Sequence, residues 1–363
     1  MNRFLCVPME LHKSVSFIDL RQMGGGKVRL KDVAERAGVA VNTASTILNK
    51  RPNSWASKET EERVFAAARD LGYRPNRAAV ALRSGSFKAI GLLLADLENP
   101  YFTHFSRVFG NEITERGYDL VIENWQTDLD REKKLLEEVV HRNVDGVVAF
   151  VSDLDEHREF LERQRKLGFP IVALAMPGIE EVSVDVVIPN FAMGLREAAD
   201  CLYELGHRRF AFLDARSRGQ RVGGRPGFFR KMIAEFGDAE TEVVGCGPSV
   251  VEACEAAHRI LARESRPSAV VALNDLTAIG VMRAAKDLGL RVPEDVSVVG
   301  IDGIPLGEQL QISLSTVVQP HFEMASKAVE FLIERIEGDT NQDPRQAEFS
   351  THFVQRESVG PKS

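Results

Sequence analysis

The chain has 363 residues, of which 44% are hydrophobic and 27% are charged, and its formal net charge is −7 at pH 7. This length and composition allow two or three packed units and exclude a chain that is disordered throughout. No apolar run is long enough to cross a membrane, and residues 1–26 lack the continuous apolar core of a secretory signal. We therefore expect a cytoplasmic protein in which residues 1–26 form a disordered extension, with a translation start at Met23 as the alternative.

Charge is distributed unevenly along the chain. Residues 27–88 contain 13 Lys and Arg against 6 Asp and Glu, a net charge of +7, so the remainder of the chain carries −14. A basic segment joined to an acidic body concentrates the attraction for phosphate groups in one place. A solvated basic surface without a partner is the alternative explanation of the charge alone.

The first predicted helix lies near the start of this basic segment. Its apolar residues recur at i, i+3, i+4 and i+7, the spacing of one helix face, and they are Leu30, Val33, Ala34 and Ala37. Gly38 ends the helix, because a tight turn between helices usually needs the left-handed backbone conformation that glycine adopts without strain.

A second helix is predicted to begin near Val41, with Ala44, Ile47 and Leu48 on its buried face. The remaining side chains are small hydrogen-bonding groups, which suit a helix lying in a major groove. We expect Val41, Asn42, Thr43 and Thr46 to enter the groove. Ser45 and nearby Lys and Arg residues are expected to hold phosphates, with Asn49 also in contact with DNA.

A third helix follows, with Ser57 as its N-cap and Gly72 at its end. These three helices form an all-α helix-turn-helix head over residues 27–75. Residues 76–88 are expected to form a hinge, because the alanine-rich helix that Asn76 would cap is too short to be stable by itself.

From Ala89 onward, short apolar runs alternate with amphipathic helical stretches. This alternation predicts parallel β-sheet covered by helices on both faces, and two such sheets fit the pattern better than one. The apolar runs lie at residues 89–95, 118–122, 146–151, 171–174, 209–213, 242–244, 269–273 and 297–301.

Polar and aromatic residues follow several of these runs. Ligands of open parallel sheets bind outside the carboxyl ends of the strands, so these residues are the candidates for a ligand cleft. The mixture of amides, carboxylates and rings suits a polyhydroxylated ligand. The candidates are Asn99, Tyr101, Phe102, Asn124, Trp125, Asn274 and Asp302. Capping of the following helix is the alternative role for Asn274 and Asp302, and turn formation is the alternative for Asn99.

The run from Leu30 to Asn49, with Tyr73-Arg74-Pro75-Asn76 and Ala79-Val80-Ala81-Leu82, resembles the head and hinge of the lactose-repressor (LacI/GalR) family of bacterial transcription regulators. The resemblance continues in the family's order over nearly the whole chain. It implies a homodimer, or a pair of such dimers, that binds a pseudo-palindromic DNA duplex and a small-molecule effector, a sugar or related metabolite, without a cofactor. It also implies that Asn76, Ala79 and Leu82 contact DNA, with Leu82 wedged into the minor groove.

For the core, the resemblance implies a periplasmic-binding-protein-like fold of two parallel-sheet α/β lobes over residues 89–358. We expect residues 89–188 and 300–318 in the first lobe and residues 190–298 and 320–358 in the second. By resemblance, Asn274, Asp302 and Gln319 line the effector pocket, and Tyr101 and Phe102 form its aromatic wall.

The chain departs from the family pattern at several positions. Thr46 stands where relatives commonly have Arg, and Gly224 stands where a pocket Arg is usual, so Arg225 or Arg221 is the expected substitute. Ala175 and Pro189 replace polar groups, which points to an unusual effector.

The sequence does not support a phosphate-binding loop, a disulfide, a metal site or a catalytic site. Gly24-Gly25-Gly26-Lys27 lacks the first glycine and the Ser or Thr of a phosphate-binding loop. The cysteines, Cys6, Cys201, Cys246 and Cys254, have no disulfide or metal spacing, and no catalytic constellation is found. The preferred hypothesis is an effector-controlled, sequence-specific transcription regulator, most simply a repressor. The alternative is a cytosolic sugar-binding protein or enzyme with the basic head as an anchor. The sequence does not identify the effector, its direction of action, the operator or the regulated genes.

Overall fold

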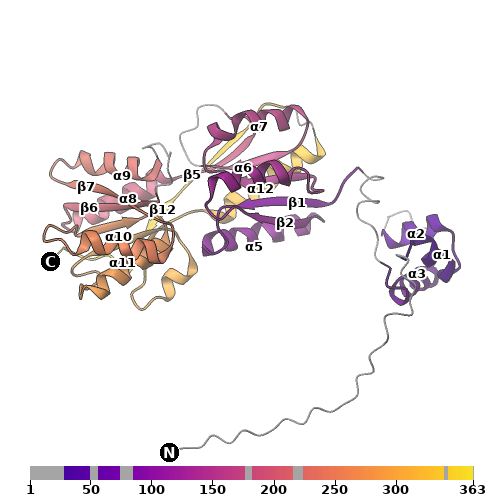
Figure 1. Ribbon diagram of the computed structural model, residues 1–363, viewed down its shortest axis with the longest axis horizontal. Coiled ribbons are helices and arrows are strands. Elements are labelled where there is room, and N and C mark those ends of the chain that lie inside the picture. The colour runs from indigo at the N-terminus through magenta and orange to yellow at the C-terminus, as the bar shows by residue number, and fades with distance from the viewer. Residues whose placement is uncertain are drawn as a thin grey trace, which may run out of the picture. The chain divides into compact units, whose positions relative to one another are not determined.

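The computed structural model describes residues 28–49, 56–73, 85–175, 182–215, 224–338 and 342–362, and the chain divides into two compact units, Met1–Val80 and Ala81–Ser363 (Figure 1). The expected N-terminal extension and most of the expected hinge lie outside the described residues. So do the single residues Trp55 and Arg221. The same holds for the proposed DNA contacts Asn76, Ala79 and Leu82.

The head contains the three predicted helices, α1 (Leu30–Ala37), α2 (Val41–Leu48) and α3 (Lys58–Asp70). Its core is made of small and branched side chains, with Val33, Ile47 and Val64 almost fully buried. Gly38 has a φ of 66°, and its backbone N–H donates to Glu35 O, so the turn between α1 and α2 has the predicted left-handed residue.

The first lobe of the core is a six-stranded sheet of order β11-β5-β4-β3-β1-β2 in which every neighbouring pair is parallel. The strands are β1 (Ala89–Leu94), β2 (Asp119–Asn124), β3 (Gly146–Phe150), β4 (Ile171–Leu174), β5 (Asp185–Asn190) and β11 (Gln346–Ser350). The helices are α5 (Pro100–Glu115), α6 (Leu129–Val139), α7 (Leu154–Lys166) and α12 (His321–Glu337). Apolar residues of α5 and α12 cover one face of the sheet, and those of α6 and α7 cover the other.

The second lobe has a sheet of order β12-β10-β9-β8-β6-β7, in which only the β10 to β12 pair is antiparallel among the described strands. The strands are β6 (Arg209–Ala215), β7 (Glu240–Cys246), β8 (Ala269–Ala272), β9 (Ser297–Asp302), β10 (Ser315–Val318) and β12 (His352–Val354). The helices are α8 (Phe191–Glu204), α9 (Gly224–Glu235), α10 (Val250–Leu261), α11 (Asp275–Asp287) and the short η1 (Pro305–Gln309). Helices α8 and α9 cover one face, and α10 and α11 cover the other.

The expected division between the lobes was wrong for the C-terminal part of the chain. Residues 300–318 belong to the second lobe, because β9 pairs with β8 and β10 pairs with β9. Helix α12 and strand β11 return to the first lobe, so that part of residues 320–358 was also misassigned, and β12 then ends in the second lobe (Figure 1). Pairing between strands that are distant in sequence decides lobe membership, and the apolar pattern of a single strand does not encode it.

The chain therefore crosses between the lobes three times, after Asn190, after Val318 and at Thr351. Two of these crossings are joined directly, since both the backbone N–H and the hydroxyl of Thr351 donate to Asn190 O at 3.0 Å. A side chain at Gly194 would lie 2.6 Å from Val317 and 2.7 Å from Thr351 Oγ1, so the three crossing segments pack too closely for any residue larger than glycine there. The lobes are thus connected by one compact bundle of strands.

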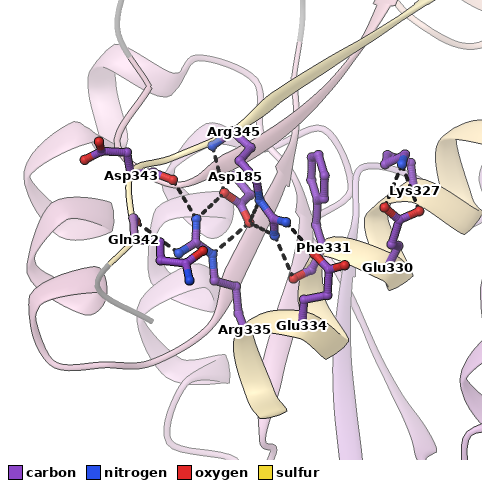
Figure 2. A network of polar contacts seen from close by, with 9 residues as sticks. All are labelled: Asp185, Lys327, Glu330, Phe331, Glu334, Arg335, Gln342, Asp343 and Arg345. Atoms are coloured by element: carbon purple, nitrogen blue, oxygen red, sulfur yellow. Dashed lines mark hydrogen bonds and ion pairs between the residues drawn. The ribbon is translucent and has the colours of Figure 1, made fainter. Parts of the chain in front are cut away.

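A buried ion-pair network holds the returning segment in the first lobe. In Figure 2, Asp185 of β5 lies between Arg335 of α12 and Arg345 at the entry to β11. Arg335 donates to Asp185 at 2.7 and 2.9 Å, and the guanidinium and backbone N–H of Arg345 donate to it at 2.7 and 2.8 Å. Burial by itself would raise the pKa of Asp185, but the hydrogen bonds from the two arginines more than offset this effect and hold the pKa below its usual value.

Replacing Asp185 with Asn should lower the free energy of unfolding by about 3 to 5 kcal/mol, because it leaves the cation of Arg335 buried without its partner. The depressed pKa means that the native carboxylate stabilises the fold above its usual pKa of about 3.9, and this contribution is lost as the pH falls further. Urea unfolding at pH 7 and pH 3 measures both effects. The control is Asp200→Asn, which removes an exposed pair with Arg196 and should cost little. Equal effects of the two substitutions at pH 7 would contradict the role of the network.

Candidate functional site

A cavity of about 440 Å³ lies between the two lobes, at the carboxyl ends of their strands. This is the place where an open parallel sheet binds its ligand, and the volume is in the range of small-molecule sites. Eight of the nine sequence candidates for the effector pocket line it, namely Asn99, Tyr101, Phe102, Trp125, Arg225, Asn274, Asp302 and Gln319.

The polar wall of the cavity is a chain of hydrogen bonds that joins the lobes. Asn99, which caps α5 in the first lobe, donates from Nδ2 to Asp302 of the second lobe at 3.2 Å. Gln319 lies where the chain crosses between the lobes and donates from Nε2 to the other oxygen of Asp302 at 2.7 Å. The hydroxyl of Tyr101 donates to Gln319 Oε1 at 3.2 Å. A ligand that bound at this wall would replace hydrogen bonds made by residues of both lobes.

Asp302 is held in an unusual state at the centre of this wall. Its φ of 120° lies in a region that L residues rarely adopt, and its side chain is only 5% exposed. Burial raises the pKa of Asp302 to about 6, although Arg225 and the hydrogen bonds from Asn99 and Gln319 act in the opposite direction. Asp302 does not cap the short helix that follows, whose N-cap is Ile304, so the capping alternative does not apply to it.

A second buried carboxyl, Asp275, lies behind the wall. It accepts hydrogen bonds from the Thr316 hydroxyl at 2.6 Å and from the backbone N–H of Ile304 at 2.7 Å. These bonds fix the segment that follows Asp302. Burial, with the neighbouring charge of Asp302 as a smaller cause, raises the pKa of Asp275 to about 8.

Arg225 supplies the positive charge of the cavity from the first turn of α9. Its guanidinium donates to Leu273 O at 2.8 Å and lies 5.1 Å from the centre of the Phe191 ring. Burial lowers its pKa, and the carboxylates of Asp302 and Asp214 act in the opposite direction. Arg225, the substitute expected from the sequence, thus lines the cavity.

Asn274 both caps helix α11 and lines the cavity. Its Oδ1 accepts the backbone N–H of Thr277 at 2.8 Å, which caps α11, and the same side chain lines the cavity. The cap uses only the oxygen of the amide, so the Nδ2 group is a possible donor to a ligand.

Aromatic rings form a further part of the cavity lining. Phe102 and Phe150 meet edge to face with ring centroids 5.0 Å apart, and Tyr101 meets Phe102 in the same way at 5.2 Å. Trp125 also lines the cavity, and its indole Nε1 is buried without a hydrogen-bond partner among the described residues.

Asn124 is the candidate that does not line the cavity. Its Oδ1 accepts the backbone N–H of Gln126 at 3.1 Å, in a turn where Gln126 and Thr127 both have a φ of 56°. Asn124 is thus the last residue of β2 and its side chain bonds to the turn that follows, whereas Trp125 lines the cavity.

Several lining residues were missed in the sequence, among them Phe150, Ser152, Phe191, Cys246 and Glu252. Ser152 directly follows the apolar run 146–151, so the rule that selected the other candidates could have found it, whereas Phe150 lies within that run. Burial raises the pKa of Cys246 to about 12, with Asp214 and Glu252 as further causes, so this residue contributes a neutral thiol.

Ser152 is positioned by a buried network that no sequence pattern suggested. Its hydroxyl and backbone N–H donate to Glu132 of α6 at 2.5 and 2.8 Å, and His157 of α7 lies 3.3 Å from the same carboxylate. Because the only hydroxyl proton of Ser152 is held by Glu132, its oxygen can only accept a hydrogen bond from a ligand.

The surface of α2 in the head is the other candidate site. Val41 is 42% exposed and Asn42 is also exposed, while Thr43, Thr46 and Asn49 are partly buried. The hydroxyl of Thr46 donates to Asn42 O at 2.9 Å, one turn earlier in the helix.

The expectation that Ser45 points away from the head was wrong. Ser45 is 6% exposed, and Asn49 Nδ2 donates to its carbonyl oxygen at 2.6 Å. The buried stripe of α2 includes Ser45 beside Ala44, because a short helix packed against two neighbours buries more than one residue per turn.

The known protein families and structures agree with this organisation. Residues 29–76 match the family model described as bacterial regulatory proteins, lacI family, and residues 199–359 match the model of the periplasmic binding protein-like domain. Within the part of the chain that the structure describes, no helix is long and apolar enough to span a membrane.

Relatives align over almost the full length of the chain. The HTH-type transcriptional repressor PurR of Yersinia pestis bv. Antiqua (strain Antiqua) is 32% identical over 333 residues, which are 91% of this chain and 96% of the relative. The lac repressor dimer bound to operator and the anti-inducer ONPF has a TM-score of 0.76 at 23% identity, covering 92% of this chain and 100% of that one. The complex of the transcriptional regulator CelR with cellobiose has a TM-score of 0.63 at 27% identity, covering 91% and 99%.

A helix-turn-helix head joined to a two-lobed core with a ligand-sized cavity defines a DNA-binding transcription regulator with a small-molecule effector site. The chain belongs to the lacI family of bacterial regulatory proteins. The resemblance and the fold class expected from the sequence are both confirmed, and the relatives are regulators rather than enzymes.

The raised pKa values of the cavity carboxyls predict a stability that falls with rising pH. A carboxyl whose folded pKa is raised stabilises the fold fully below its unfolded pKa and loses this contribution as the pH rises through the folded value. For Asp302 the window runs from about 3.9 to about 6. Relative to the parent, Asp302→Asn should therefore gain stability with rising pH, by up to about 1.4 kcal/mol per pH unit in that window.

Urea unfolding of both proteins at intervals between pH 4 and pH 8 measures this difference. The hydrogen bonds that the substitution disturbs change the stability by a constant, so the slope with pH isolates the ionisation. Asp130→Asn, at an exposed position on α6, is the control and should show no such slope. Parallel pH profiles of parent and Asp302→Asn would show that this carboxyl does not ionise at a raised pKa.

Proposed function

We propose that this protein is a sequence-specific repressor whose affinity for operator DNA is controlled by a sugar or related small metabolite bound between its core lobes. The observation that carries this proposal is the cavity wall in which Asn99, Asp302 and Gln319 form hydrogen bonds across the boundary between the lobes. An effector that competes for these bonds changes the free energy of one lobe arrangement relative to another.

The chemistry of the cavity supports a compact ligand with both hydroxyl or amide groups and an apolar face. Asp302 and Ser152 offer acceptors, whereas Arg225 and Asn274 offer donors. The rings of Phe102, Phe150 and Trp125 cover the apolar face of such a ligand. The negative charge of Asp302 is balanced by Arg225, which favours an uncharged effector.

The exposed residues of α2 support binding in a major groove. Val41, Asn42, Thr43 and Thr46 are the proposed base-contacting residues, with Asn49 beside them. Ser45 is too buried for the phosphate contact first expected of it, so nearby Lys and Arg residues are the better candidates for phosphate binding. In the proposal, Leu82 of two hinges wedges into the minor groove between the half-sites, as in the family.

Asp145 provides a route from the core to the hinge. It accepts hydrogen bonds from the Ser86 hydroxyl at 2.6 Å and from the backbone N–H groups of Phe87 and Lys88 at 2.7 and 2.8 Å. These residues are the last three of the expected hinge, residues 76–88, and Asp145 immediately precedes β3, whose last residue, Phe150, lines the cavity. A shift of the first lobe is thereby transmitted to the end of the hinge.

The operator is proposed to be a pseudo-palindrome bound by a homodimer, with a pair of dimers as the larger assembly, in the cytoplasm. The lac repressor relative was solved as a dimer bound to operator. We propose that the effector is released from the protein chemically unchanged, because the protein acts by binding it rather than by converting it. Coupling between effector and operator must be reciprocal, so each changes the affinity for the other by the same factor.

Selection of bound duplexes from a random pool, with and without candidate metabolites, tests the proposal. The parent should enrich one palindromic motif over bulk DNA. Asn42→Ala should relax the base preference at one position of each half-site, by about 1 to 3 kcal/mol of discrimination. Asn111→Ala, on the exposed side of α5, is the matched control and should keep the parent motif. If the parent enriches no motif, the proposed function is refuted. If Asn42→Ala enriches the same motif as the parent, only the proposed base contact of Asn42 is refuted.

Replacing Asp145 with Asn should weaken operator binding roughly two- to thirtyfold, the range of couplings carried by single residues. The amide keeps only one acceptor oxygen where the carboxylate has two, so Ser86, Phe87 and Lys88 at the end of the hinge are held less firmly. Fluorescence anisotropy with the selected operator measures the affinity, and thermal unfolding verifies that the core remains folded. Asp130→Asn is again the control. Operator affinity equal to that of the parent would exclude Asp145 from the coupling route.

A further inference from the structure

Helices α10 and α11 bring together three metal-binding side chains that no catalytic or effector role explains. Cys254 and His258 are four residues apart on α10 and therefore lie on one face of the helix. Asp287 is the last residue of α11, which packs along α10. One ligand atom from each residue lies within 4.8 Å of the other two.

We propose that Cys254, His258 and Asp287 form a site for a zinc ion, with the fourth position open to water or another ligand. One thiolate, one imidazole and one carboxylate are ligands of the borderline character that Zn²⁺ prefers, whereas Ca²⁺ and Mg²⁺ prefer oxygen ligands only. The charges also balance, since the two anionic ligands neutralise the dication.

The separations are close to those of a zinc site. His258 Nε2 lies 3.6 Å from Asp287 Oδ2. Tetrahedral zinc, with bonds of about 2.0 to 2.3 Å, places its ligand atoms roughly 3.3 to 3.6 Å apart. The sulfur of Cys254 lies within 4.8 Å of these two atoms, so the proposal requires a side-chain rotation that brings it closer.

Among the described residues, Arg283 competes with a metal ion for the proposed site. Its Nε donates to both oxygens of Asp287, at 2.8 and 2.9 Å, and its side chain is largely exposed. An exposed pair of this kind contributes little to stability, so a metal ion can displace the arginine from one oxygen. Removing Arg283 should therefore tighten zinc binding, an effect opposite in sign to that of removing a ligand.

The site has a structural connection to the effector cavity. Glu252 near the start of α10 and Asn274 at the start of α11 both line the cavity, and the two helices run side by side from there to the proposed ligands. An ion between them would fix the position of one helix relative to the other.

Cys254 and His258 of α10 were not identified as metal ligands from the sequence. A cysteine and a histidine four residues apart are too few to hold zinc by themselves. The third ligand is 29 residues further along the chain and joins them only when α11 packs on α10.

Zinc binding to the full-length chain, freed of metal by dialysis against a chelator, tests the proposal. The probe is Zn²⁺ alone, measured by competition with a chromophoric zinc indicator. One ion should bind per chain, and Co²⁺ in its place should give the near-ultraviolet band of a thiolate ligand. Cys254→Ser and His258→Gln should each weaken binding at least about tenfold, and Arg283→Gln should strengthen it.

Cys201→Ser is the matched control, because Cys201 is also a partly buried free cysteine and lies on α8. It should leave zinc binding unchanged. Metal-free unfolding curves verify that each variant folds, and added zinc should raise the melting temperature of the parent but not of Cys254→Ser. Absence of stoichiometric binding, or binding that survives both Cys254→Ser and His258→Gln, would overturn the proposal.

Discussion

The contact on which the proposed function of the core depends is the hydrogen-bond chain from Asn99 through Asp302 and Gln319 to Tyr101. Its members come from both lobes and from the crossing between them, so it exists only when the lobes lie at one particular angle. The three crossing segments, packed around Gly194 and Thr351, limit how far that angle can change. A small ligand can therefore bias the arrangement of two large lobes by replacing a few hydrogen bonds.

The same wall contains an electrostatic conflict. Asp302 and Asp275 are both buried, and the charge of Asp302 makes ionisation of Asp275 less favourable. Folding tolerates this arrangement because backbone N–H groups, hydroxyls and Arg225 surround the two carboxyls. Polar groups held in place at the expense of stability are typical of ligand sites, where the ligand supplies the missing interactions. By contrast, Asp185 is paired with two arginines and serves to hold α12 and β11 in the first lobe (Figure 2).

Much of the cavity followed from one topological rule. Polar and aromatic residues at the carboxyl ends of parallel strands converge at one edge of a sheet, which led to Asn99, Trp125, Asn274 and Asp302 before any contact was known. The rule failed for Asn124, whose side chain bonds to the turn after β2. It also passed over Phe191, which directly follows β5, because residues 185–190 were not among the predicted strands. Ser152 directly follows the apolar run 146–151, so the rule also applies to it, but its orientation depends on Glu132 and His157 from two helices.

The sequence by itself determined the helices of the head, the alternation of strands and helices in the core, and the family. These follow from local periodicity, from Gly38 at a left-handed turn and from short motifs, all of which lie within a few residues of one another. Tertiary structure alone decided that β9 and β10 belong to the second lobe, that α12 and β11 return to the first, and that Ser45 is buried. It also decided that Cys254 and His258 meet Asp287. Each of these outcomes depends on contacts between residues that are distant in sequence, and such contacts form only when whole elements pack together.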